Sequence, residues 1–324
     1  MKSKPVIFHA DDYAANEEIS EHILDCYREG VLNSLSILPN SIHLDSCMKL
    51  FAPYREKIKT SIHFNLAEGH CLSKPSQVSW LVDERGMFSI SFFKVLLLSF
   101  TRKKKELKKQ IKTEIQAQLV RMLPYVDTLR IDSHQHYHMI PIVLESILEV
   151  VDALPGTREG ALWLSKGAAG GTEDNEKKAT KKQNIRKNNG EKPEIEFIRV
   201  PAEPIGPYLK HPGFYLSYRP INFVKNIVLN VLNIWDGHLL KAYRRKSAVF
   251  FGIMMSGEMD LKRVRTLVPD FKKIADRKEL PLEVLCHPGR ARRAEELMDP
   301  RNELCKEFYL SEMRVVEKET LEKI

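Results

Sequence analysis

Ionisable side chains gather at a few points of the chain, and the densest group is the segment 132–138. It reads Asp-Ser-His-Gln-His-Tyr-His. If the segment is extended, His134, His136 and His138 point to one side, whereas in a helix only the first and last share a face. Neutral imidazoles are the commonest metal ligands, and a carboxylate such as Asp132 can orient one. The segment therefore predicts a metal site, with a polar loop as the alternative.

Two adjacent carboxylates, Asp11 and Asp12, follow the short apolar run 6–10. Adjacent strand residues point to opposite sides, but both carboxylates could reach one site if the backbone turns where the strand ends. One could then bind a metal while the other acts as a base. Taken alone, the pair could equally form a turn or cap the next helix.

Three further residues are candidates because each lies in or just after an apolar run. His63 lies in a segment of alternating apolar residues, where a lone histidine is more often a core residue than a ligand. Arg199 lies in the apolar run 196–200, and His287 directly follows the run 282–286. His287 could serve as a general acid, since histidine gains its charge near neutral pH. One carboxylate and two histidines suit Zn²⁺ or a similar divalent ion, which polarises carbonyls and activates water. The residues thus predict a hydrolase, with amide, ester and phosphate substrates all open.

The elements that must position these residues alternate between strands and helices. Apolar runs typical of buried strands fall at 6–10, 34–38, 59–66, 128–131, 196–200, 248–253 and 282–286. Helical periodicity falls between them, at 16–30, 44–51, 107–123, 141–154, 221–243 and 261–275, and again at 312–324. Such alternation predicts βαβ units and a parallel sheet, whose carboxyl edge carries the active site in β/α barrels. We predict an α/β fold: one (β/α) barrel domain over 1–324, incomplete or distorted, with about seven strands.

Composition narrows the function classes. The chain has 324 residues, 43% of them apolar, and a formal net charge of +8. Much of the positive charge lies in the run 102–109 and in a segment 166–195 with the composition of a flexible insertion. No GxGxxG or Walker A motif supports nucleotide binding. Sparse, scattered cysteines, the lack of a signal peptide and an apolar segment 86–101 too short to span a membrane predict a cytoplasmic protein.

Taken together, these segments resemble the YdjC-like carbohydrate deacetylase family, which is related in fold to the polysaccharide deacetylases. The matching motifs read HADDYAAN at 9–16, IHFNLAEG at 62–69, TEIQAQL at 113–119, DSHQHYHMIP at 132–141, VFFGIMMSG at 249–257 and CHPG at 286–289. The resemblance implies an incomplete β/α barrel and one divalent metal ion, Mg²⁺ or Zn²⁺. It also implies removal of an N-acetyl group from an amino sugar, such as an N-acetylglucosamine-type oligosaccharide or a glycoconjugate. A lipid-linked amino sugar would be the expected substrate if the protein contacts a membrane.

The resemblance also implies roles for single residues. It makes the metal ligands Asp12, His63 and His134. It makes Asp11 the base that activates water, although the roles of the two aspartates could be exchanged, and His287 the acid that protonates the departing amine. The remaining candidates would support these residues or face the substrate: Arg199, Asp132, His136 and His138. The chain departs from the family at His9, where asparagine is usual.

Three other interpretations remain. The apolar segment 92–100 with its basic run, and 221–243 followed by Arg244, Arg245 and Lys246, could make a peripheral membrane contact. We favour core-packed helices with solvated basic ends.

Nucleic-acid binding is supported only by the net positive charge, and the sequence lacks a recognition motif, so we expect no nucleic-acid partner. A metal-dependent phosphoesterase is the alternative enzyme class, but it would usually have more carboxylates or a second metal. As for the oligomeric state, a homodimer is suggested by analogy alone.

Overall fold

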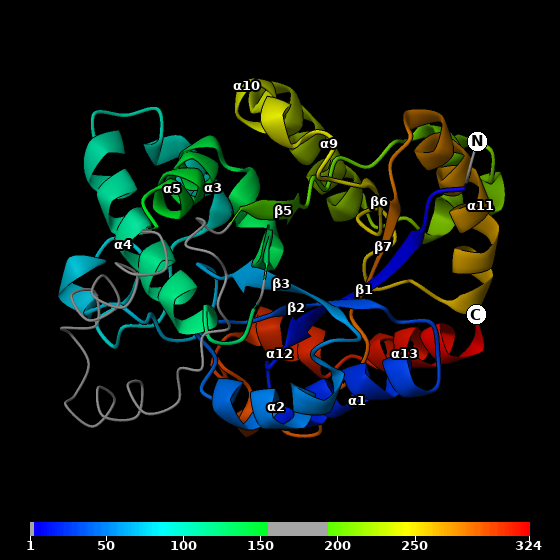
Figure 1. Cartoon of the computed structure of the whole chain (residues 1–324), viewed down its shortest axis with the longest axis horizontal. Coiled ribbons are helices and arrows are strands. Elements are labelled where there is room, and N and C mark those ends of the chain that lie inside the picture. Colours follow the sequence, from blue (N-terminus) through cyan, green and yellow to red (C-terminus); the bar gives the residue numbers. More distant parts are fainter. Residues whose placement is uncertain (1–2, 127, 155–193) are drawn as a thin grey trace.

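A computed structural model describes residues 3–126, 128–154 and 194–324 (Figure 1). The segment predicted as a flexible insertion, 166–195, lies outside the described residues as far as 193. A short apolar stretch at 161–164, whose sequence does not decide between strand and helix, also lies outside them.

Seven parallel strands form one curled sheet in the order β5-β4-β3-β2-β1-β7-β6. The strands are β1 (Val6–Tyr13), β2 (Ser34–Ile37), β3 (Lys59–Phe64), β4 (Leu129–Ser133), β5 (Ile195–Ile198), β6 (Val249–Phe251) and β7 (Leu282–Cys286). The two outer strands, β5 and β6, lie close to each other at one point. There the Ile198 amide of β5 donates a hydrogen bond of 2.8 Å to the carbonyl of Lys246, just before β6. The prediction of an incomplete β/α barrel with about seven strands is confirmed.

Helices cover the outside of this sheet in groups (Figure 1). One group contains α1 (Glu17–Arg28), α2 (Leu44–Phe51), α12 (Glu303–Tyr309) and α13 (Met313–Lys323). A second contains α3 (Phe92–Leu98), α4 (Lys104–Met122) and α5 (Pro141–Asp152). The others are α8 (Gly206–Leu209), α9 (Pro220–Trp235), α10 (Gly237–Leu240) and α11 (Leu261–Lys278). No helix in the described ranges has both the length and the apolar character needed to cross a membrane.

Helix α1 forms where its sequence predicts it. The Asn16 side chain accepts a hydrogen bond from the Ile19 amide at 2.8 Å, which caps the first turn. Glycine is common just past the end of a helix, so the sequence predicts Gly30 as the cap of the other end. This prediction is wrong, because the cap is Glu29 in a right-handed conformation. Gly30 serves close packing instead: a Cβ there would lie 2.2 Å from the Leu321 carbonyl oxygen of α13.

Two predicted boundaries also differ. The single helix expected at 221–243 is broken: α9 ends at Trp235 and the short helix α10 starts at Gly237. Glycine lowers the stability of a helix interior, and the break falls on the Asp236-Gly237 pair. Strand β1 continues to Tyr13, beyond the predicted end at Ala10, and its register shifts between those two residues.

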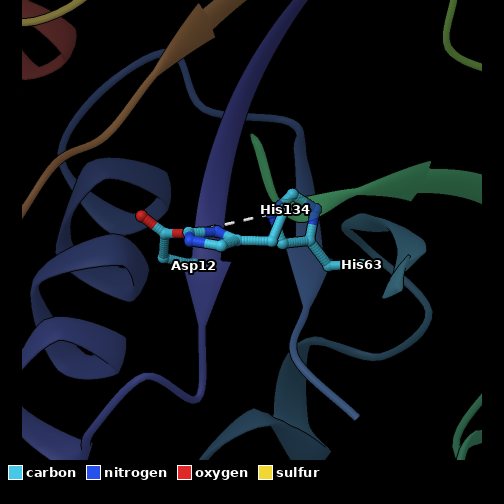
Figure 2. A group of neighbouring side chains, drawn as sticks. All are labelled: Asp12, His63 and His134. Carbon is cyan, nitrogen blue, oxygen red and sulfur yellow. Dashed lines mark hydrogen bonds and ion pairs between the residues drawn. The ribbon is translucent and has the colours of Figure 1, made fainter. Parts of the chain in front are cut away.

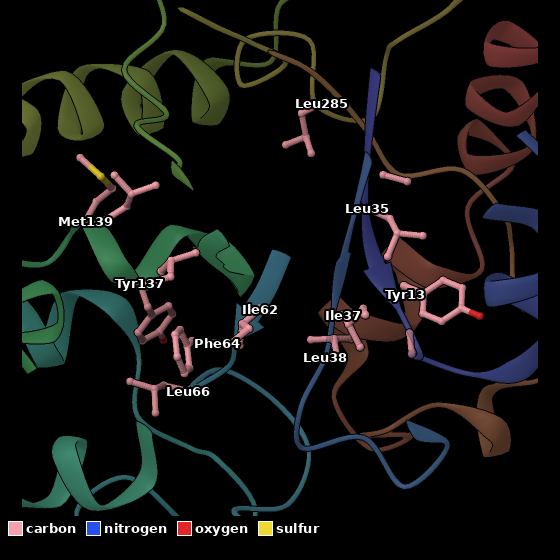
Figure 3. Packing of buried hydrophobic residues seen from close by; sticks show 14 of the residues in the cluster. Tyr13, Leu35, Ile37, Leu38, Ile62, Phe64, Leu66, Tyr137, Met139 and Leu285 are labelled. Carbon is pink, nitrogen blue, oxygen red and sulfur yellow. The ribbon is translucent and has the colours of Figure 1, made fainter. Parts of the chain in front are cut away.

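The sheet has one apolar and one polar face. Strand residues such as Ile37, Ile62 and Phe64 are buried in the hydrophobic core beneath the helices (Figure 3). The alternate residues, on the inner side of the curl, include polar side chains that bond to one another across neighbouring strands. These side chains include His9, Asp11, Ser36, His63, Asp132, Arg199 and Glu283. The interior of the curl is therefore a buried, hydrogen-bonded charge network.

Candidate active site and metal centre

The end of β1 brings two adjacent carboxylates into the same buried region. Asp12 has a left-handed backbone with φ 67°, and the strand register shifts here. A non-glycine residue rarely adopts this conformation, and such strain collects at functional sites. The consequence is that Asp11 and Asp12 both lie close to His63, with one oxygen of each 3.8 Å from its Nε2. A regular strand would have sent the two carboxylates to opposite faces.

Asp12, His63 and His134 form a group with metal-ligand chemistry (Figure 2). One potential ligand atom from each lies within 4.8 Å of the others, and all three side chains are buried. Asp12 Oδ1 is 3.1 Å from His134 Nδ1. The three side chains come from or just after three different strands, β1, β3 and β4.

The hydrogen bonds around His63 fit a metal ligand. Its Nδ1 bonds to Asp132 Oδ1 at 2.7 Å, which fixes the ring from behind. Its Nε2 is buried and has no hydrogen-bond partner among the described residues. Buried polar atoms are almost always bonded, and a ligand imidazole commonly has a carboxylate on its other nitrogen. The residues present therefore fit a divalent cation at this position.

Asp12 and His134 are supported from the C-terminal part of the chain. Arg314 of α13 donates to Asp12 Oδ2 at 3.1 Å and to the Gly289 carbonyl at 2.6 Å. Burial raises the pKa of Asp12, but His134 and Arg314 outweigh burial and hold it well below its ordinary value. Glu68 lies 3.6 Å from His134 Nε2 and accepts a hydrogen bond from Tyr309 at 2.6 Å.

Asp11 belongs to a different network, centred on Arg199. The guanidinium donates to both oxygens of Asp11, each bond 2.8 Å long. It also donates to Glu283 at 2.9 Å and lies 3.3 Å from Asp132. Burial opposes ionisation of Asp11, yet Arg199 holds its pKa well below the ordinary value. Burial also opposes ionisation of Asp132, but Arg199 and His63 outweigh it and lower the pKa of Asp132 to about 2.

The Arg199 network also contains a second set of ligand-type atoms, from His9, Asp11 and Asp132. His9 Nε2 bonds to Ser36 Oγ at 2.6 Å and lies 3.4 Å from Asp11. Here the Arg199 guanidinium contacts both carboxylates and bonds to both oxygens of Asp11, so these oxygens are less available to a cation. This second set is therefore less suited to a cation than the group of Asp12, His63 and His134.

The three histidines of 134–138 separate, because the segment is neither a straight strand nor a regular helix. Gln135 and His136 both have left-handed backbones, with φ of 50° and 60°. His138 turns away from the metal-ligand group, bonding to the Arg199 carbonyl at 3.0 Å and to Ser133 Oγ at 2.6 Å. The His136 ring lies 6.0 Å from that of Phe250. Of the two patterns considered from the sequence, neither is present.

His287 follows β7 at the same edge of the sheet. It is only partly buried, as is His136, whereas the three ligand-type residues are buried. Its backbone amide donates to Glu317 of α13, and its ring lies edge-on to Phe308 at 5.1 Å. Burial lowers the pKa of His287 to about 4, despite the nearby Asp12 and Asp11.

Several residues of this region had not been predicted. Glu68 was part of the HFNLAEG motif, and Glu283 interrupts an apolar strand, so each left a signal in the sequence. Arg314 and Glu317 left none, because they lie in an ordinary charged helix far from every motif. They reach the site only because α13 packs against α1, next to the end of β1.

Comparisons with known proteins place this geometry in context. The chain is 28% identical to a carbohydrate deacetylase of Danio rerio over 149 residues, which is 45% of this chain and 46% of that protein. It is 28% identical to one of Thermoanaerobacter pseudethanolicus over 148 residues, 45% of this chain and 56% of that protein. A human carbohydrate deacetylase is 28% identical over 172 residues, 52% of this chain and 51% of that protein. Each match thus covers about half of either protein.

A solved structure supports the fold over nearly the whole chain. It is a protein of Enterococcus faecalis V583 whose description proposes cellobiose-phosphate cleavage. The two structures align with a TM-score of 0.57 over 99% of this chain and 91% of the other, at 14% identity. The family model described as YdjC-like protein matches residues 5–323. As the motifs indicated, the chain belongs to the YdjC-like family.

Proposed function

We propose that this protein is a metal-dependent carbohydrate deacetylase, which hydrolyses the N-acetyl group of an amino sugar to an amine and acetate. The observation that carries the proposal is the group of Asp12, His63 and His134, with the unbonded Nε2 of His63 aimed into it and Asp11 alongside. The family and its relatives named carbohydrate deacetylase support the reaction class.

The cation site would be made by Asp12, His63 and His134. A divalent ion such as Mg²⁺ or Zn²⁺ there would polarise the amide carbonyl and acidify a water molecule. Arg314 holds the second oxygen of Asp12, which leaves Oδ1 turned toward the two histidines. Asp132 fixes the ring of His63. These supports keep the three side chains in place before a cation arrives.

Asp11 would take the proton from the attacking water. Both of its oxygens are bonded to Arg199, so the carboxylate is held in one orientation and ionised at neutral pH. This pairing also argues against Asp11 as the metal ligand, because both of its oxygens already accept hydrogen bonds from a guanidinium. The pairing keeps Asp11 a weak base, so orientation rather than basicity would be its main contribution.

His287 would deliver a proton to the departing amine. Burial keeps its imidazole neutral in the resting protein at pH 7, with the pKa near 4. The acid role therefore requires that the ring take up the proton released by the attacking water, passed on from Asp11, as negative charge develops on the substrate. Glu317, beside the ring at 3.9 Å from Nδ1, would stabilise the protonated form. Together Asp11 and His287 would move the proton that converts amide and water into amine and acetate.

The test is acetate release from N-acetylglucosamine oligomers and from lipid-linked N-acetyl amino sugars, with metal-free, Zn²⁺-loaded and Mg²⁺-loaded protein. We expect release that depends on the metal. Phosphate release from phosphomonoesters is measured in parallel, as is DNA and RNA binding. Absence of acetate release, together with phosphate release or tight nucleic-acid binding, would overturn the proposal.

Variants separate the two aspartates. Asp11→Asn should retain metal binding and lose about 10²–10⁴-fold in kcat, the usual contribution of a general base. His134→Ala should lose metal binding in a calorimetric titration. Matched controls on exposed residues are Asp45→Asn and His238→Ala, which should leave both properties unchanged. Equal loss of metal in Asp11→Asn and His134→Ala would contradict the division of roles.

A further inference from the structure

Helix α9 buries two leucines, Leu229 and Leu232, on its inner side, but it leaves a large part of its apolar surface exposed. Two asparagines, Asn222 and Asn226, are buried on its inner side. Large apolar side chains are exposed on its outer side: Ile221, Phe223, Val224, Ile227, Val231, Ile234 and Trp235. Ile234 is 78% exposed. A helix in water normally buries its apolar stripe, so the expectation of a core-packed helix holds only for the side of α9 that carries Leu229 and Leu232.

The asparagines explain why the helix is held in this orientation. Asn226 accepts from the Glu203 amide at 3.3 Å and donates to the Glu203 carbonyl at 3.2 Å. Asn222 donates to the Ser256 carbonyl at 3.0 Å. These bonds satisfy backbone groups of two loops that follow β5 and β6. Rotating α9 to bury its apolar side would break them, so its outer face is a fixed feature of the fold.

The exposed apolar surface continues onto α3. The rings of Phe100, just after α3, and Trp235, at the end of α9, stack at 5.0 Å between centroids. Phe93 and Leu97 on α3 are 58% and 69% exposed. Two segments more than a hundred residues apart in sequence thus form one apolar face, which we call the α3–α9 face. Contiguous apolar surface of this kind usually marks an interaction site.

The residues around the α3–α9 face carry positive charge. Residues 86–105 contain no acidic side chain, and residues 204–257 contain only Asp236, which is buried. Five cations in these ranges pair with acids from elsewhere in the chain: Lys104, Lys210, Arg219, Arg245 and Lys246. The other lysines and arginines, which form no ion pair with a described residue, are Lys94, Arg102, Lys103, Lys105, Lys225, Lys241 and Arg244. A cavity of about 320 Å³ beside the end of α9 is lined by Asn233, Arg244, Arg245 and Lys278. An apolar face with a cationic border complements an anionic bilayer surface.

We propose that the α3–α9 face docks this protein onto an anionic lipid bilayer, with the apolar side chains at the headgroup boundary and the basic border against lipid phosphates. Charge decides between a bilayer and a second copy of the chain. In a two-fold dimer the same positively charged border would face itself, and like charges would repel. The proposal does not depend on the deacetylase activity.

The docking face adjoins the candidate active site. Helix α9 contacts the turn His134–Met139, which carries one of the proposed metal ligands, and Asn222 is bonded to the loop after β6. A docked molecule would therefore hold its site near the membrane surface. An amino sugar attached to a lipid would then reach the site without leaving the bilayer.

The test uses the full-length protein in co-sedimentation with vesicles of phosphatidylcholine alone and with added phosphatidylglycerol. We expect binding to the anionic vesicles that weakens as salt rises, and much less binding to neutral ones. The double variant Ile227→Asp/Ile234→Asp should lower the partition coefficient at least about tenfold, since it removes apolar contacts and adds two anionic groups. The control Ile42→Asp/Leu304→Asp makes the same change at exposed residues elsewhere and should bind normally.

Folding and activity are measured on the same samples. Both double variants should keep the wild-type circular dichroism and the wild-type turnover of a water-soluble substrate, because neither touches the site. Failure of the wild-type protein to bind anionic vesicles would overturn the proposal. Equal loss of binding in both double variants would do the same. A concentration-dependent dimer that Ile227→Asp/Ile234→Asp abolishes, without vesicle binding, would assign the face to a second copy.

Discussion

The two neighbouring carboxylates of β1 are held by two different parts of the molecule. Asp11 is held from within the sheet: Arg199 follows β5, and its other partners lie on β4 and β7. Asp12 is held from outside the sheet by Arg314 of α13. Arg199 occupies both oxygens of Asp11, whereas Arg314 occupies one oxygen of Asp12. Adjacent residues of the same type thus acquire different chemistry from their partners.

Because of this difference, Asp11 is held in a fixed orientation, whereas Asp12 keeps one oxygen available to bind a cation. A carboxylate with both oxygens bonded to a guanidinium is held in one orientation, which suits proton transfer at a fixed point. A carboxylate with one oxygen directed toward two imidazoles can contribute that oxygen to a cation. The Arg199 network should therefore control stability and the pH dependence of turnover, and Arg314 should control metal affinity. Three predictions test that contrast.

The largest expected effect is on stability. Arg199→Met would leave Asp11, Asp132 and Glu283 buried without their cation, and removing one partner of a buried ion pair costs about 3–5 kcal/mol. Arg314→Met breaks one buried ion pair where Arg199→Met breaks three, and Asp12 keeps His134 as a partner, so the cost should lie near the lower end of that range, about 3 kcal/mol. Urea unfolding followed by fluorescence measures both free energies. Equal destabilisation would mean that the two arginines are structurally equivalent.

The next effect is on metal affinity. Arg314→Gln should weaken binding of the divalent ion about 10–100-fold, the usual loss when a group that orients a ligand is removed. Arg199→Lys should leave affinity within about threefold of wild type, because Arg199 has no hydrogen bond to Asp12, His63 or His134 among the described contacts. Isothermal titration with Zn²⁺ gives both values. A larger loss in Arg199→Lys would contradict the assignment of Asp12 as the ligand.

The smallest effect is a shift in pH dependence. Arg199 lowers the pKa of Asp11, so the carboxylate stays ionised, and able to accept a proton, down to acidic pH. Lysine cannot make the paired bonds, and the pKa of Asp11 should therefore rise in Arg199→Lys. The acid limb of kcat/KM should move up by about one pH unit, equivalent to about 1.4 kcal/mol. An unchanged acid limb in metal-loaded Arg199→Lys would exclude Asp11 as the group that titrates.

The sequence predicted the fold well because the fold depends on repeated local patterns. Apolar runs of strand length alternated with helical periodicity, and the seven predicted strands all form. The polar residues at the ends of these runs led to Asp11, His63 and His134, and the structure brings them together. Strand order alone places such residues at one edge, so no distant information was needed.

The remaining features depend on backbone conformations and contacts that no short segment encodes. The left-handed residues Asp12, Gln135 and His136 decide which side chains enter the site, yet these residue types gave no sign of it. His138 seemed equivalent to His134 by spacing, and the turn directs it to a carbonyl oxygen instead. Arg314 reaches Asp12 across 302 positions, through the packing of a terminal helix.

The near meeting of β5 and β6 has a mechanical consequence. A closed barrel would join these two strands with a full ladder. In the part of the chain that the structure describes, a single backbone hydrogen bond, from the Ile198 amide to the Lys246 carbonyl, spans the gap. The next residue, Arg199, reaches across the interior to β1 and β7. Its guanidinium is thus a cross-brace that replaces an eighth strand. A substitution that weakens the Arg199 contacts would let β5 and β6 move apart and would also misorient Asp11, the proposed base. The rigidity of the sheet and the geometry of the proposed reaction therefore depend on the same side chain.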